Sequence, residues 1–188
     1  MAIPTKRQDE DCILDTVRNN PTRGDVLDAI DQWNTDVNHV NHFLDTFHTL
    51  GNSTAIQNAA TNVLQFAKDE PCQLATLSNI ADFQNGDGPN AFECALEDLG
   101  EVFETRVLDN IRNIIMSPSN NVTVQHAVHD INIFRCCNVL PDLDILWRDS
   151  ASDKNLNQVP VSPARPNACY SYNCSADPLA SVCKAERN

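Results

Sequence analysis

Basic residues are scarce in this chain of 188 residues, which has 13 lysines and arginines against 26 aspartates and glutamates. The formal net charge is therefore −13. Nucleic acids and anionic membrane surfaces are bound through clustered lysine and arginine side chains, and here these residues are scattered. We expect no nucleic-acid partner.

Long apolar runs are also missing. No run approaches the roughly 20 residues that a helix needs to cross a bilayer, so we expect no membrane span. Residues 1–10 lack the apolar segment of a signal peptide. If the protein is secreted, we expect that its signal has already been removed.

Catalytic motifs are the third absence. The chain has no G-x-S-x-G elbow, no phosphate-binding loop and no catalytic cysteine context. Nothing indicates a bound cofactor, and the sequence favours a protein without enzymatic activity.

Eight cysteines are present, an even number, and none of them forms the C-x-x-C pairs of a zinc site. Chains in a reducing cytosol rarely carry so many without a metal, so we expect disulfides and a secreted, extracellular protein. The expected disulfide residues are Cys12, Cys72, Cys94, Cys136, Cys137, Cys169, Cys174 and Cys183.

Two weaker features accompany the cysteines. Lys6-Arg7 is a possible dibasic processing site, although two charges on a loose end explain it equally well. Three glycosylation sequons begin at Asn52, Asn121 and Asn173. A chain this rich in asparagine, serine and threonine produces such sequons by chance, so the cysteines carry the prediction of secretion.

Apolar residues recur at spacings of three and four over most of the chain, which is typical of amphipathic helices. We expect Asp25 to cap the first helix, Gly51 to follow its end, Pro71 to stop the second helix and Pro141 to follow the fifth. The expected helices cover residues 25–50, 55–68, 72–83, 90–116 and 123–139. The predicted fold class is therefore all-α, a disulfide-stapled bundle of about five helices.

The chain divides into three parts. Residues 1–24 are expected to be a flexible N-terminal segment, and residues 25–147 a helical domain. Residues 148–188 read as an irregular, proline-containing arm that carries three cysteines. Cys136 and Cys137 diverge by about 100° on a helix, so we expect them to bond different partners and to help fasten this arm.

Six large apolar residues on the predicted helices are candidates for an apolar ligand site. The alternative is that they fill an ordinary core, since the same periodicity predicts both. The candidates are Trp33, Val40, Phe43, Phe47, Phe103 and Phe134.

Two histidine pairs are candidates for metal binding, His39 with His42 and His126 with His129. Their i, i+3 spacing can present two imidazoles to one metal ion. Each pair lies largely off its apolar stripe, so a structural role is the alternative. For His126 and His129 we expect partial burial beneath the arm.

The run from Val26 to Asp45, followed by Gly51 and the small-residue stretch from Ile56 to Ala60, resembles small secreted proteins of filamentous fungi. Among these, it resembles the hydrophobic surface-binding and cell-wall galactomannoprotein-like helical proteins. The resemblance covers about residues 25–140 and implies binding of apolar ligands or surfaces. The eight cysteines depart from that group and resemble cysteine-rich fungal effectors, which implies a host target.

Three functions remain open. The first is a secreted, non-enzymatic binding protein for an apolar small molecule, an apolar surface or a cell-wall component. The second is an effector that binds a host protein. The third is a metal-binding protein or a hydrolase that uses the helix-borne histidines with a nearby carboxylate.

Overall fold

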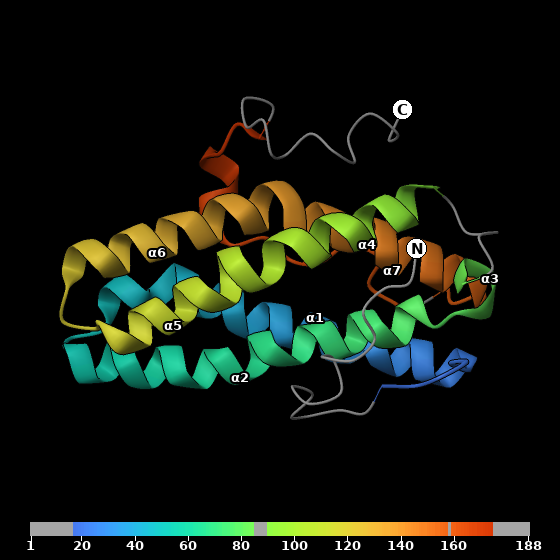
Figure 1. The fold of residues 1–188 in the computed structure, drawn as a ribbon, viewed down its shortest axis with the longest axis horizontal. Coiled ribbons are helices and arrows are strands. Elements are labelled where there is room, and N and C mark those ends of the chain that lie inside the picture. The colour runs from blue at the N-terminus through green and yellow to red at the C-terminus, as the bar shows by residue number, and fades with distance from the viewer. Residues whose placement is uncertain (1–16, 85–89, 158, 175–188) are drawn as a thin grey trace.

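The computed structural model describes residues 17–84, 90–157 and 159–174, and these residues contain helices and no strand. Four long helical rods lie side by side along the length of the molecule, with one short helix near one end (Figure 1). The predicted all-α, disulfide-stapled fold is confirmed.

The first rod is α1 (Arg23–Thr46), and it is capped by Thr22 rather than by Asp25. The Thr22 hydroxyl oxygen accepts from the Asp25 backbone N–H, and the Asp25 carboxylate accepts from the Thr22 N–H at 2.8 Å. This capping box satisfies two orphan donors at once. The helix ends before the short 3₁₀ turn η1 (Phe47–Thr49), so the expected end at Gly51 was also wrong.

The second rod, α2 (Ser53–Ser78), continues past Pro71, where the sequence predicted a stop. A proline inside a helix costs about 3 kcal/mol. The residues after it include the buried Cys72, Ala75 and Leu77, whose burial offsets that cost. Most of the helix expected at residues 72–83 is therefore the last part of α2, and α3 (Ala81–Gln84) follows it as a short separate helix.

The third rod spans the predicted residues 90–116 but contains a π turn. It consists of α4 (Asn90–Val102), the π turn η2 (Phe103–Leu108) and α5 (Asp109–Met116).

The fourth rod consists of α6 (Asn121–Phe134), the π turn η3 (Arg135–Val139) and α7 (Leu140–Asp153). Pro141 does not follow the helix but lies in the first turn of α7. The preceding π turn interrupts the regular i→i+4 ladder there, so a missing N–H is tolerated. The helix also continues past residue 147, and the arm begins only after Asp153.

The rods pack as neighbours around one core: α1 on α2, α2 on α5, α5 on α6, and α4 on α7. Trp33 and Trp147 meet inside it with ring centroids 6.2 Å apart in an edge arrangement. Both indoles are almost fully buried, at 2% and 0% exposure. Burial of this kind supplies most of the favourable free energy of folding.

Candidate functional site

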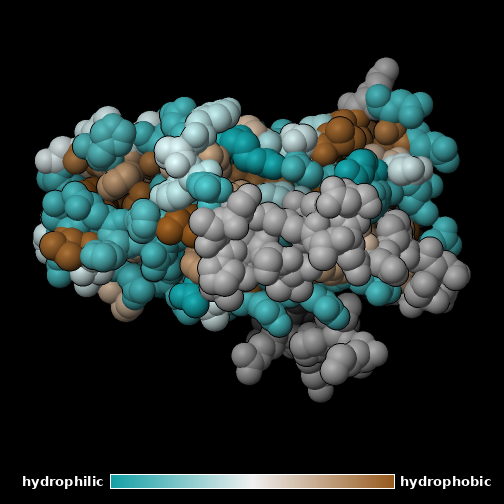
Figure 2. Space-filling model, turned by 90° about the horizontal axis from the view of Figure 1, so that it is seen from above, coloured by the Kyte–Doolittle hydropathy of each residue, from teal (hydrophilic) through white to brown (hydrophobic). Residues whose placement is uncertain are grey.

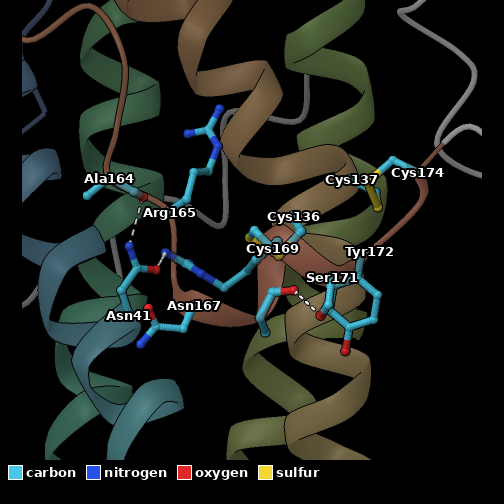
Figure 3. The surroundings of a disulfide bond; sticks show 12 residues. Asn41, Cys136, Cys137, Ala164, Arg165, Asn167, Cys169, Ser171, Tyr172 and Cys174 are labelled. Atoms are coloured by element: carbon cyan, nitrogen blue, oxygen red, sulfur yellow. Dashed lines mark hydrogen bonds between the residues drawn. A yellow bond between two sulfur atoms is a disulfide. The ribbon is translucent and has the colours of Figure 1, made fainter.

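The adjacent cysteines of η3 fasten the arm. Cys136 bonds Cys169 and Cys137 bonds Cys174 (Figure 3). Both of these η3 cysteines are buried. The expectation of two different partners is confirmed, and both partners belong to the arm. Cys72 and Cys94 are also disulfide-bonded, while Cys12 and Cys183 lie outside the described residues.

Hydrogen bonds hold the preceding part of the arm to two rods. The Asn41 side-chain amide donates to the carbonyl oxygen of Ala164 at 2.8 Å, and the Asn167 N–H donates to Asp45 at 2.8 Å. Arg165 forms an ion pair of 2.6 Å with Asp144 on α7. The arm therefore crosses from α7 over α1 to η3 and α6.

Residues 166–174, which we call the clamped segment, contain the 3₁₀ turn η4 (Asn167–Ser171) and no charged residue. Tyr170 lies one residue after a bonded cysteine and is 83% exposed. Two disulfides therefore hold an exposed aromatic ring on a short uncharged loop.

Tyr172 lies on α6 rather than in solvent. Its hydroxyl is 3.1 Å from Nδ1 of His129, and the two ring centroids are 5.9 Å apart. Burial raises the pKa of the Tyr172 phenol above its usual range, and the Asp130 carboxylate raises it further. This contact orients the clamped segment between its two disulfides.

A buried polar network lies behind the arm. The Arg135 guanidinium donates to Oε1 of Glu70 at 3.1 Å, and the indole N–H of Trp33 donates to Oε2 at 3.1 Å. A further nitrogen of Arg135 donates to Oδ1 of Asn41 at 3.4 Å. Asn41 thus connects the network to the arm through Ala164.

This network is closed to solvent, with Arg135 at 0% and Glu70 at 1% exposure. Burial raises the pKa of Glu70, because loss of solvation outweighs the charge of Arg135 and the two hydrogen bonds. The network meets the arm through the hydrogen bond from Asn41 to Ala164.

The histidine pairs are not brought into a metal site. His39 stacks on Phe66 with ring centroids 3.7 Å apart, and His42 is exposed on the same helix. Within the described part of the chain, no three histidine, cysteine or acidic side chains gather to hold an ion.

The expectation that the arm partly buries His126 and His129 was wrong, because both are exposed. The arm reaches α6 chiefly through its disulfides to η3, and Tyr172 is the arm residue that meets His129. His126, one helical turn before His129, is exposed to solvent.

The six apolar candidates belong to the core or pack against it. Five are at most 8% exposed, and Phe47 is partly buried beside them. The reading of these residues as an ordinary filled core accounts for their positions. The six are Trp33, Val40, Phe43, Phe47, Phe103 and Phe134.

The three sequon asparagines, Asn52, Asn121 and Asn173, are all exposed. Lys6 and Arg7 lie outside the described residues. Among the helices that the structure describes, none is long and apolar enough to cross a membrane.

Sequence reasoning missed the network and the exposed tyrosine. A signal for the network existed, because Asn41 and Glu70 stand beside apolar-stripe positions where a polar side chain needs a buried partner. Nothing in the pattern marked Tyr170, since exposure in an irregular segment has no periodicity to reveal it.

No family model matches the chain, and no curated protein or solved structure shows a significant match to it.

Proposed function

We propose that this protein is an extracellular, non-enzymatic binding protein that recognises a partner protein through its clamped segment. One observation carries the proposal: Tyr170 is 83% exposed on a loop whose flanking cysteines bond two adjacent, buried cysteines. An effector that binds a host protein would be one form of this function.

The composition of the clamped segment supports the proposal. Its residues include two tyrosines, two asparagines and a serine, the types that dominate antibody binding loops. Tyrosine supplies a large contact area with few rotatable bonds, and tyrosine is among the residues that most often dominate interface energies. Because the segment is uncharged, it suits a partner surface that is polar but largely neutral.

The two disulfides that hold the clamped segment also support the proposal. A loop that is already ordered loses less conformational freedom when it binds, which improves affinity without any new contact. Disulfides that serve this purpose persist in oxidising compartments, which favours an extracellular location.

The other two functions have less support. An apolar ligand among the six core residues would have to displace their packing. A metal site built on the histidines would need a third converging ligand, and the described residues supply none.

The test is site-specific photo-crosslinking in the full oxidised chain. Tyr170→p-benzoylphenylalanine places a crosslinker on the clamped segment, and Gln65→p-benzoylphenylalanine places the same group on an exposed position of α2. Both variants are applied to the surface proteins of the cells that the protein meets.

The proposal predicts one discrete crosslinked protein at position 170, and none at position 65. Competition by the unmodified chain should remove that crosslink. Equal labelling from both positions, or none from position 170, would show that the clamped segment is not the recognition surface.

A further inference from the structure

One end of the bundle combines exposed apolar side chains with two sequons. Met116 and Val122 are 71% and 64% exposed, and they flank the turn at 117–120. The neighbouring turn holds Asn52, and Gln57 of α2 donates to the carbonyl oxygen of Ile115 in α5 at 3.0 Å, which joins the two helices next to these turns. Figure 1 shows both turns at the left end, where Figure 2 shows apolar residues at the surface.

Two of the segments that form this end also lack charge. Residues 49–67 and 113–129 contain no lysine, arginine, aspartate or glutamate, although the chain as a whole carries a net charge of −13. Repulsion between like charges keeps proteins apart in solution, and that protection is absent here. An exposed apolar site beside uncharged segments invites self-association.

Asn52 is placed to carry a sugar without losing its structural role. Its side-chain oxygen caps α2 by accepting from the Ala55 N–H at 2.9 Å, and its backbone is extended. The amide nitrogen, the atom that a glycan bonds, takes no part in that cap. Thr54, the sequon hydroxyl residue, is exposed as well.

Asn121 is equally accessible. Asn120, and not Asn121, caps α6, because the Asn120 side chain accepts from the Thr123 N–H at 3.2 Å. Asn121 is the exposed first residue of α6, immediately before the exposed Val122.

We propose that Asn52 and Asn121 carry N-linked glycans that cover Met116 and Val122 and keep this end of the bundle from self-associating. The inference rests on the extracellular location in the proposed function. Bulky, hydrophilic glycans at exposed asparagines increase solubility, and here they would replace the missing charge.

The modification uses a lipid-linked oligosaccharide diphosphate as its co-reactant. A bond forms between the anomeric carbon of the first sugar and the side-chain nitrogen of Asn52 or Asn121. The bond from that carbon to the diphosphate oxygen breaks, its electron pair leaves with the lipid diphosphate, and the nitrogen releases one proton.

The first test is the intact mass of the chain secreted from a eukaryotic host. Asn52→Gln and Asn121→Gln should each remove one glycan mass. Asn58→Gln, at an exposed asparagine of α2 outside any sequon, should remove none.

The second test is sedimentation of the doubly substituted protein. It should self-associate with a dissociation constant about tenfold or more below that of the glycosylated protein. Adding Met116→Gln and Val122→Gln, which create no new sequon, should abolish that gain.

Two results would overturn the inference. A secreted chain with all its cysteines oxidised but no glycan at either position would refute the modification while leaving the extracellular location intact. A deglycosylated chain that associates no more than the glycosylated one would refute the shielding. A chain found with free thiols inside cells would refute the proposed function instead.

Discussion

Arg135 and Glu70 form an ion pair sealed inside the bundle, with side-chain exposures of 0% and 1% and an Nη1–Oε1 distance of 3.1 Å. The pair joins the π turn η3 to α2. Moving two charges out of water costs several kcal/mol each, so such a pair depends on further hydrogen bonds to both groups. Trp33 and Asn41 supply such bonds, while Nε of Arg135 is buried with no hydrogen-bond partner among the described residues. Asn41 extends the network to the arm.

The two halves of this pair should respond unequally to substitution. Glu70→Leu leaves a guanidinium that cannot lose its proton, and it should lower the free energy of unfolding by about 3–5 kcal/mol. Arg135→Met leaves a carboxyl whose pKa burial already raises, so it can become neutral and should cost less. Urea denaturation of both variants measures the difference. Equal costs would show that Glu70 cannot take up a proton in the fold.

The pKa of Glu70 also predicts a pH dependence of stability. Because the folded state raises this pKa above the ordinary value of 4.5, the folded state binds the proton more tightly than the unfolded chain. The stability that this group contributes is therefore fully present below the ordinary value and is lost as the pH rises through the raised pKa.

The matched variant for this dependence is Glu70→Gln. The unfolding free energy of the native protein minus that of Glu70→Gln should fall as the pH increases above 4.5. Glu101→Gln, at an exposed position of α4, controls for the change in net charge. A difference that rises with pH would mean that Arg135 and the hydrogen bonds outweigh desolvation.

The two arm disulfides should act non-additively. Each closes a long loop on its own, since the bonded residues are 33 and 37 positions apart. With one bond in place, however, the other closes a ring of only a few residues. Replacing either pair by serine should cost about 2 kcal/mol, whereas replacing both pairs should cost about 6 kcal/mol. Urea midpoints of the three variants measure this, and simple additivity would contradict it.

Asn41 should contribute to the stability with which the arm packs on the helices. Asn41→Leu removes the donor to Ala164 and the acceptor of Arg135, and should cost about 1–3 kcal/mol. Hydrogen exchange of residues 159–168 should become faster, while that of α2 should change less. Asn38→Leu, at an exposed position of the same helix, is the control. Unchanged exchange in the arm would show that the disulfides alone seat it.

Apolar periodicity predicted the rods well because their packing depends on the stripes it detects. The third rod keeps its predicted bounds at 90 and 116 despite the π turn η2. Besides the two ends of α1, the errors occurred at Pro71 and Pro141, where local propensity favoured a helix end. Burial of the residues beyond each proline overrode that propensity, and a single sequence does not show how much each position buries.

The site was predictable only where covalent geometry constrained it. The adjacency of Cys136 and Cys137 implied two different partners, and the structure has two. The link from Glu70 through Arg135 to Asn41 joins positions as far as 94 residues apart, and no spacing rule relates them. The position of Tyr170 depends on how the arm is fastened, so its exposure followed only from the structure.

The affinity of the Tyr170→Ala variant for the crosslinked partner tests the central claim most directly. Because Tyr170 is 83% exposed, its removal should leave the fold and the disulfides unchanged. The account predicts that the dissociation constant rises about thirtyfold or more, as expected for an aromatic side chain that dominates an interface. A dissociation constant equal to that of the native protein would contradict recognition through the clamped segment.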